Sequence, residues 1–121
     1  MSVESYKDLI VWQKSVELVI AVYGLTDRFP RSEMYGLVSQ MRRAAVSIPS
    51  NIAEGRRRSS RKDFRNFLLN AFGSGAELET QVEIARRLGF GKSSDYSRVD
   101  SLLDEVMRML NKMVSNLQAT S

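Results

Sequence analysis

Apolar residues recur at alternating intervals of three and four along four separate stretches of the chain, and this spacing most limits what the chain can fold into. Such spacing puts the apolar side chains on one side of an α-helix that packs against other helices. No stretch of useful length alternates between apolar and polar residues, as a half-buried strand does. The connections are short, which makes consecutive helices antiparallel neighbours. The sequence therefore predicts an all-α fold, an antiparallel up-and-down four-helix bundle.

Capping residues and helix breakers predict where these helices begin and end. Ser5 and Ser32 are good N-caps for the first two helices, and Pro30 stops the first. Ser60 precedes the third helix, and Gly89 suits the left-handed position just after it. The predicted helices cover residues 6–29, 33–57, 61–88 and 95–117, within one domain of residues 1–121.

The predicted core consists of one apolar stripe on each helix. On the first helix the predicted core stripe is Leu9, Trp12, Val16, Val19, Tyr23 and Thr26, with Leu18, Val22, Leu25 and Phe29 as a second stripe beside it. The other stripes are Leu37, Met41, Ala44, Ala45, Ile48 and Ile52; Phe64, Leu68, Ala71, Gly75, Leu78, Val82, Ala85 and Leu88; and Tyr96, Val99, Leu103, Val106, Leu110, Met113 and Leu117. The second stripe of the first helix and Met107, Met109 and Met113 exceed what one seam requires. They either fill gaps in the core or form a subunit interface.

Three features interrupt the regular helical pattern. Pro49 lies inside the second predicted helix, where we expect a kink. Asn51 and Glu54 follow it, and bonds to backbone groups freed by the proline are favoured over a small polar site. Gly75 occupies a core position of the third helix, which favours close helix packing over a phosphate cradle, because a cradle requires a loop before a helix start.

Cysteine and histidine are both absent from the chain. The absence of cysteine excludes disulfides and thiolate chemistry. The absence of histidine excludes most zinc sites, Glu-x-x-His di-iron sites and histidine-based nucleophiles. Glu77, Glu79 and Glu83 therefore have no histidine to complete a metal site, and we expect them on a solvated or salt-bridging face. The composition predicts a non-enzymatic protein with no metal and no cofactor.

The sequence also bears on where the protein resides. No run of about 18 apolar residues occurs that could span a membrane. The opening residues, MSVESYKDL, lack the basic and then apolar pattern of a secretory signal. We therefore expect a cytoplasmic protein with no membrane partner.

Positive charge is concentrated in one central segment. Residues 41–66 carry eight basic and two acidic side chains, whereas the whole chain has a net charge of +4. Arginine side chains match the geometry of phosphate groups and remain charged at any working pH. The segment predicts binding of nucleic acid, either RNA or DNA, against the simpler interpretation of a solvated loop that keeps the protein soluble. The candidate nucleic-acid-binding residues are Arg42, Arg43, Arg56, Arg57, Arg58, Arg61, Lys62 and Arg65.

Arg42 and Arg43 have an alternative role. They lie about four turns before the other candidates on the second predicted helix. An ion pair with acidic residues of a neighbouring helix or subunit is as well supported there as a phosphate contact.

Several longer motifs resemble a known family. The central one is QMRRAAVSIPSNIAEG at residues 40–55, with LIVWQ at 9–13, Phe29-Pro30, Glu33, YGL at 35–37, GSGAELET at 73–80 and LGF at 88–90. From about residue 9 to 117 the chain is similar to the four-helix bundle family of 23S ribosomal RNA intervening-sequence proteins. That family includes the accessory variability proteins of diversity-generating retroelements.

The resemblance implies a bundle protomer that assembles into a homo-oligomer, a ring-like pentamer. It implies nucleic-acid binding through a basic surface, with RNA slightly favoured, and in the retroelement branch a reverse transcriptase as protein partner. It carries over no catalytic residues. A ring would repeat the basic segment and raise affinity through effective concentration. The alternative function is a protein-interaction adaptor or scaffold, for example for a reverse transcriptase, whose basic patch meets an acidic partner.

Overall fold

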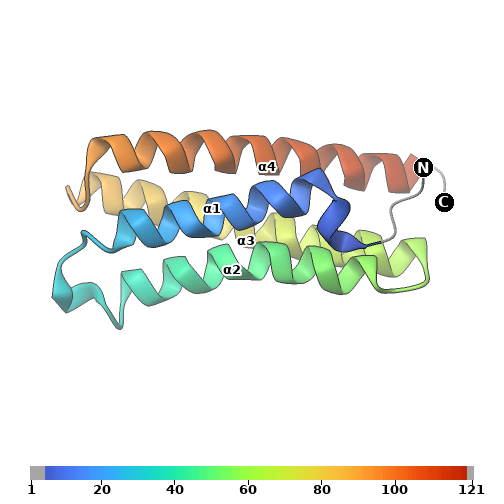
Figure 1. Cartoon of the computed structure of the whole chain (residues 1–121), viewed down its shortest axis with the longest axis horizontal. Helices are drawn as coiled ribbons and strands as arrows, with labels where there is room; N and C mark the ends of the chain where they lie inside the picture. Colours follow the sequence, from blue (N-terminus) through green and yellow to red (C-terminus); the bar gives the residue numbers. More distant parts are fainter. Residues whose placement is uncertain (1–4, 120–121) are drawn as a thin grey trace.

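The structure is a computed structural model that describes residues 5–119, and within them four long helices run antiparallel to their neighbours (Figure 1). The α-helices are α1 (Ile10–Thr26), α2 (Leu37–Arg56), α3 (Arg61–Arg87) and α4 (Ser93–Ala119). Two short 3-10 helices, η1 (Tyr6–Asp8) and η2 (Arg31–Glu33), precede α1 and α2. No strand occurs in this part of the chain. The predicted antiparallel up-and-down four-helix bundle is confirmed.

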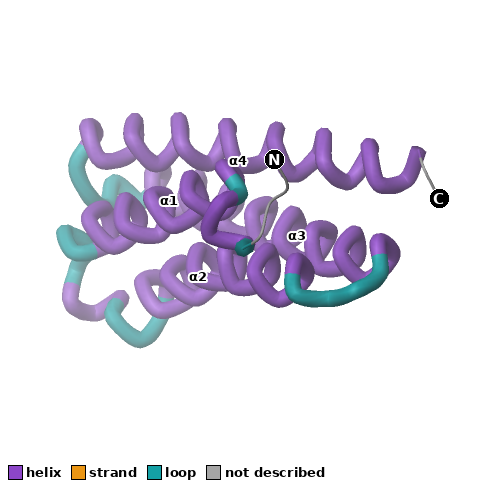
Figure 2. The backbone as a smooth tube through the Cα atoms, turned by 45° about the vertical axis from the view of Figure 1, so that its right-hand side comes forward, coloured by secondary structure: helices purple, strands orange, loops and turns teal. Residues whose placement is uncertain are grey.

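Each α-helix packs against two others. The pairs are α1 with α2, α2 with α3, α3 with α4, and α1 with α4. The connecting loops, drawn in teal in Figure 2, lie at the two ends of the bundle. The turn between α2 and α3 is at one end, and the connections from α1 to α2 and from α3 to α4 are at the other. None of the helices in residues 5–119 combines the length and apolar character needed to cross a membrane.

The start of the first helix differs from the prediction. Ser5 does act as a cap, but of the 3-10 turn η1, since its Oγ accepts a hydrogen bond from the Lys7 N–H at 3.1 Å. Leu9 is then extended, with φ −72° and ψ 126°, which separates η1 from α1. α1 therefore begins at Ile10, and it ends at Thr26 rather than running on to Phe29.

The second helix also begins later than predicted, because Ser32 does not cap it. Ser32 lies within η2, and α2 starts at Leu37 after Gly36. The Leu37 N–H instead donates to Glu33 Oε1 at 3.4 Å. α2 then continues through the buried Pro49, where the expected kink stays a prediction.

The predicted features around α3 are present. Ser60 Oγ accepts a hydrogen bond from the Asp63 N–H at 3.0 Å, which caps the start of α3. Gly89 has φ +77°, the left-handed conformation predicted for the residue past the helix end. Leu88, by contrast, was assigned to the core and is 57% exposed. The helix ends at Arg87, so Leu88 no longer continues the buried stripe.

The core of α1 is centred on the second predicted stripe, while the first lies at its edge, with Thr26 buried and Leu9, Trp12 and Val19 packed against the core. Leu18, Val22 and Leu25 are fully buried, whereas Tyr23 is 42% exposed and Trp12 and Val19 are only partly buried. The helix is thus rotated from the predicted orientation toward the second stripe, which lies about 100°, one residue, from the first. The second stripe is therefore core, and its interpretation as a subunit interface is wrong.

The core stripes of α2, α3 and α4 are confirmed apart from Leu88. Gly75 is buried in α3, where an added Cβ would overlap Met107 Sδ of α4. The predicted close packing at Gly75 is therefore correct, with a methionine side chain as the neighbour. Met107 fills the space above this glycine, and Met109 and Met113 also pack against the core.

Candidate nucleic-acid interface

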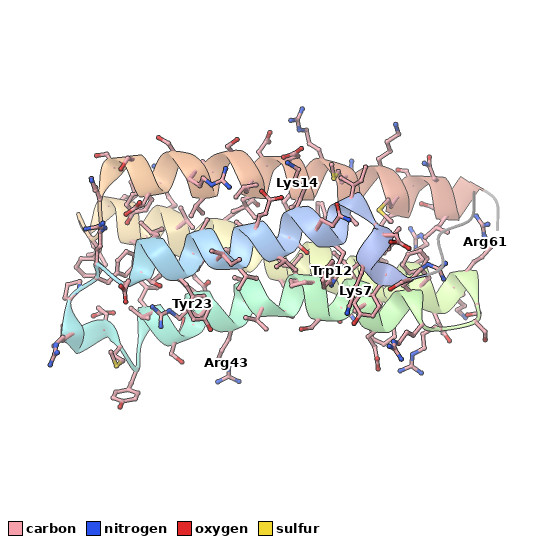
Figure 3. All side chains as sticks on the ribbon, in the orientation of Figure 1. Lys7, Trp12, Lys14, Tyr23, Arg43 and Arg61 are labelled. Atoms are coloured by element: carbon pink, nitrogen blue, oxygen red, sulfur yellow. The ribbon has the colours of Figure 1, made fainter. Side chains whose placement is uncertain are left out.

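The eight predicted binding residues fall into two groups. Arg43 and its neighbour Arg42 lie on α2, about 20 Å along the helix from Arg56. Figure 3 shows Arg61 at one end of the bundle and Arg43 well away from it. The remaining six residues surround the turn between α2 and α3, and we call them the basic end: Arg56, Arg57, Arg58, Arg61, Lys62 and Arg65.

The basic end is built by a tight turn between two closely packed helices. Gly55 is buried in the last turn of α2, where an added Cβ would lie 2.6 Å from Phe67 Cβ of α3. Arg57 forms the C-cap of α2, with its N–H donating to the Ala53 carbonyl at 3.3 Å. Ser60 then caps α3. The close approach of the helices brings cations that follow α2 beside those that begin α3.

Two cations of the basic end are engaged by neighbouring side chains. Arg58 pairs with Glu54 at 3.1 Å, and its guanidinium lies 5.1 Å from the ring centroid of Phe67. Arg65 Nε donates to the Val114 carbonyl at 3.3 Å, and its Nη2 donates to Gln118 Oε1 at 3.1 Å. Arg65 thus ties α3 to the last turns of α4.

Two other cations of the basic end have no ion pair in the described part of the chain. Arg57 and Lys62 are exposed, and within residues 5–119 neither forms an ion pair. Arg57 lies 5.6 Å from the ring centroid of Tyr6. Lys62 and Arg61 occupy the first turn of α3, where the helix dipole favours anions over cations. Asp63 is the acidic residue of that turn. The positive helix end and these side chains together make this surface suited to an anion.

The Arg42 side chain makes its contacts within the bundle. Its Nε donates to Thr26 Oγ1 at 2.9 Å, and its guanidinium lies 4.3 Å from the ring centroid of Tyr23. Its Nη2 is 4.0 Å from Asp27 Oδ1. Arg42 thus has the alternative role predicted for it, an ion pair with an acidic residue next to a neighbouring helix. Arg43 is exposed and, in the part of the chain that the structure describes, forms no ion pair.

A polar link between α2 and α3 escaped the sequence analysis. The Ser47 and Ser74 hydroxyls are hydrogen-bonded at 2.8 Å. Asn51 Nδ2 donates to the Ser47 carbonyl at 2.8 Å and to Ser47 Oγ at 3.0 Å. Asn51 thus has a structural role, but the predicted bond to a backbone group freed by Pro49 is wrong for this residue. Its backbone partner is the Ser47 carbonyl and not the Ala45 carbonyl, which Pro49 leaves without its usual donor. The sequence offered one signal for this link. Small side chains occur both in GSGAELET and in the central motif QMRRAAVSIPSNIAEG.

The comparison with protein families decides what the chain is related to. The family described as 23S rRNA-intervening sequence protein matches residues 7–112, which is most of the chain. The chain belongs to this family. A crystal structure of a protein with unknown function from the S23 ribosomal protein family of Bacteroides thetaiotaomicron VPI-5482 has the same fold, with a TM-score of 0.79 and 24% identity. The likeness covers 88% of this chain and 96% of that one. A comparison with curated proteins finds no match.

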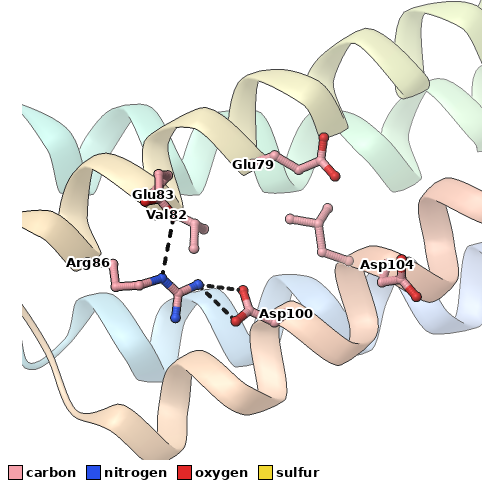
Figure 4. A pocket seen from close by; sticks show the side chains of 7 residues that line it. Glu79, Val82, Glu83, Arg86, Asp100 and Asp104 are labelled. Atoms are coloured by element: carbon pink, nitrogen blue, oxygen red, sulfur yellow. Dashed lines mark hydrogen bonds and ion pairs between the residues drawn. The ribbon is translucent and has the colours of Figure 1, made fainter.

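The protein also has an acidic surface between α3 and α4 (Figure 4). Glu79, Glu83, Asp100 and Asp104 line a small hollow of about 160 Å³ there. Arg86 donates from Nη2 to both oxygens of Asp100, at 2.9 and 2.8 Å. A hydrogen bond from Arg87 lowers the pKa of Glu83 below its ordinary value of 4.5. Residues 5–119 contain no cluster of acidic side chains arranged to hold a metal ion, and Glu83 lies in the predicted salt-bridging face.

Proposed function

We propose that this family member is a non-enzymatic, single-domain nucleic-acid-binding bundle that holds phosphate groups at the basic end. The observation that supports the proposal most is the pair Arg57 and Lys62, two exposed cations beside the positive end of α3 with no ion pair in residues 5–119. The family's description refers to 23S rRNA, which favours RNA over DNA as the natural ligand. The lack of histidine and cysteine supports a binding role over an enzymatic one.

The expected contact is electrostatic. Arginine and lysine neutralise backbone phosphates and release condensed counterions, which makes affinity fall steeply with salt. A single basic end offers few free cations, so one copy would bind weakly. Assembly into a homo-oligomer, which the family resemblance suggests to be a pentamer, would repeat the basic end and raise affinity through effective concentration.

A protein-interaction adaptor is the second candidate function. Ile84 of α3 and Leu88, the C-cap residue after it, are 47% and 57% exposed, and Ile84 borders a hollow of about 510 Å³ with Ala76 and Thr80. Neighbouring exposed apolar side chains are typical of a surface that meets another protein. In this alternative the basic end would bind an acidic partner protein, and nucleic acid would bind only weakly.

The two functions are separated by binding of fluorescently labelled structured RNA and duplex DNA. The test variant reverses two charges at the basic end, Arg57→Glu with Lys62→Glu. The control reverses two exposed cations at the opposite end of the bundle, Arg31→Glu with Lys92→Glu, which changes the net charge by the same amount. We expect the test variant to lose at least about tenfold in affinity, and the control to change about two- to threefold.

Three outcomes of this experiment would contradict the proposal. Wild-type protein that binds neither RNA nor DNA at low salt removes nucleic-acid binding altogether. Equal losses in the test and control variants would mean that only net charge matters. An undiminished affinity in the test variant would place the binding surface elsewhere. Circular dichroism checks that both double variants keep the helical content of the wild type.

A further inference from the structure

Tyr23 lies on α1 beside a surface hollow shared with α2. The hollow measures about 400 Å³ and is lined by Tyr23, Arg42, Arg43, Val46 and Ser47. Tyr23 is 42% exposed and belongs neither to the buried core nor to an aromatic pair among residues 5–119. Exposed aromatic rings are the surfaces on which unstacked nucleic-acid bases stack.

Arg42 is held against one face of the Tyr23 ring, so a base can stack only on the outer side of this pair. The guanidinium carbon lies 4.3 Å from the ring centroid, and Nε donates to Thr26 Oγ1 at 2.9 Å. Thr26 is buried, and its hydroxyl donates in turn to the Val22 carbonyl at 2.8 Å. Arginine guanidinium planes also stack on bases. Since the fold already orients this pair, a ligand would lose little side-chain freedom on binding there.

Arg43 places a free cation at the edge of the same hollow. Its side chain projects away from the bundle (Figure 3), and it has no ion pair within the described part of the chain. A second, polar hollow of about 370 Å³ lies on its other side, lined by Gln40, Arg43, Ala44, Ser47, Ser74 and Glu77. An aromatic ring with an unpaired arginine beside it is the combination that single-strand-binding proteins use for a base and its phosphate.

The geometry of α2 aligns this hollow with the basic end. Arg43 and Arg57 are 14 positions apart. Arg57, the C-cap of α2, keeps helical backbone angles. At 3.6 residues per turn the two residues therefore lie within about 40° of each other around the helix axis and about 21 Å apart along it. A stacked strand advances about 3.4 Å per nucleotide, so about six nucleotides cover this distance. A single strand of that length reaches from one cationic site to the other along α2.

We infer that the hollow beside Tyr23 binds one unstacked base of a single-stranded nucleic acid, with Tyr23 and Arg42 as the stacking pair and Arg43 on the adjoining phosphate. This inference rests on the proposed nucleic-acid function and gives it a preference for single strands. A subunit contact is the other use of such a surface, but two of the five lining residues are arginines. A subunit contact would remove the exposed Arg43 from water with no ion-pair partner in the described residues, which is costly, whereas a phosphate group would pair with its charge.

The test compares two labelled 12-nucleotide RNA strands that carry the same phosphates, one with all bases and one abasic. Stacking of a base contributes about 1–3 kcal/mol, so wild-type protein should prefer the strand with bases by about 5- to 150-fold. Tyr23→Ala should bring the ratio of the two Kd values close to one, and Tyr23→Phe, which keeps the ring, should preserve it. Tyr35→Ala is the matched control, since Tyr35 is 94% exposed and lies outside the hollow. It should leave the ratio unchanged.

The ratio separates failure of this inference from failure of the proposed function. If wild-type protein binds neither strand, both are overturned. If it binds both strands equally, or if Tyr23→Ala keeps the wild-type ratio, only the base site is overturned. A changed native mass in Tyr23→Ala with an unchanged ratio would make the surface a subunit contact and also overturn it. Photocrosslinking of 4-thiouridine RNA to wild-type protein needs no variant, and the crosslink should map to the α1 peptide that contains Tyr23 and not to that of Tyr35.

Discussion

Arg42 of α2 donates a 2.9 Å hydrogen bond to the hydroxyl of Thr26 on α1. The acceptor is buried, and the donor is also stacked on Tyr23 at 4.3 Å. Two adjacent arginines of the central motif therefore have different roles. Arg42 joins two helices, whereas Arg43 faces solvent.

The first prediction uses this difference between neighbours. Arg42→Ala should lower the free energy of unfolding by about 1–2 kcal/mol, because it removes a charged hydrogen bond and a cation–π contact. Arg43→Ala should change it by less than about 0.5 kcal/mol, as for other surface substitutions. Urea unfolding followed by circular dichroism measures both. Equal losses in the two variants would contradict the assigned roles.

The second prediction concerns two glycines that lie in helices but differ in surroundings. A Cβ at Gly55 would lie 2.6 Å from Phe67 Cβ, whereas a Cβ at Gly73 meets no atom within 4 Å. Gly55→Ala should therefore destabilise the protein by about 1–3 kcal/mol, because α2 and α3 must move apart. Gly73→Ala should stabilise it by about 0.5–1 kcal/mol, because alanine is the better helix former.

Thermal and urea unfolding of the two glycine variants provide the measurement. Both substitutions add the same methyl group to a helix, so the difference between them isolates packing. Stabilisation by Gly55→Ala would show that the α2–α3 contact is looser than the structure has it.

The third prediction concerns salt. Under the proposed function, the logarithm of the RNA affinity should fall linearly with the logarithm of salt concentration. Neutralising one phosphate contact, by Arg57→Gln or by Lys62→Gln, should reduce the magnitude of that slope by about one. Titrations at several salt concentrations measure it. Lys92→Gln at the far end should leave the slope unchanged, and a slope equal in all variants would exclude phosphate contacts at Arg57 and Lys62.

The fourth prediction concerns alkaline pH. Burial raises the pKa of the Tyr96 phenol above its ordinary value of 10.0, because the phenolate would lose its hydration. The folded state therefore favours the protonated phenol, which also donates to the Phe90 carbonyl. Its contribution to stability should be complete below pH 10 and decline as pH rises above that value.

Unfolding at a series of pH values between 8 and about 12 checks this dependence. Tyr96→Phe should be less stable than wild type at neutral pH, since the hydrogen bond to Phe90 is lost, and should lose less stability as pH rises. The two curves should converge at high pH. Parallel curves over the whole range would mean that Tyr96 does not contribute to the alkaline loss.

Local sequence signals predicted local features well. Ser60 and Gly89 act through their own backbone neighbourhood, so their roles as cap and left-handed residue could be read directly. The prediction of Ser32 as the N-cap of α2 was wrong, because the Glu33 side chain accepts the hydrogen bond from the Leu37 N–H at the start of that helix. The prediction of Leu88 as a core residue was wrong, because the spacing of three and four continues past Arg87, where the helix ends.

The basic segment was evident from composition, but the hydrogen-bond and ion-pair partners of each cation were not. Arg58 and Arg65 find partners four and more than forty positions away in the chain. The Arg58 partner lies one turn away, whereas the Arg65 partners depend on how α3 and α4 meet, which charge counts do not contain. The Ser47–Ser74 hydrogen bond has the same origin, since its two residues come from different helices.

The sequence by itself determined that four amphipathic helices form an antiparallel bundle, because the period of apolar residues and the short connections are local properties of the chain. Only the tertiary structure decided which of two adjacent stripes on α1 is buried. These stripes differ by about 100° of rotation, and either is apolar enough to face a core. Packing against α2 and α4 selected Leu18 and Val22, and that rotation left Tyr23 at the surface beside Arg42.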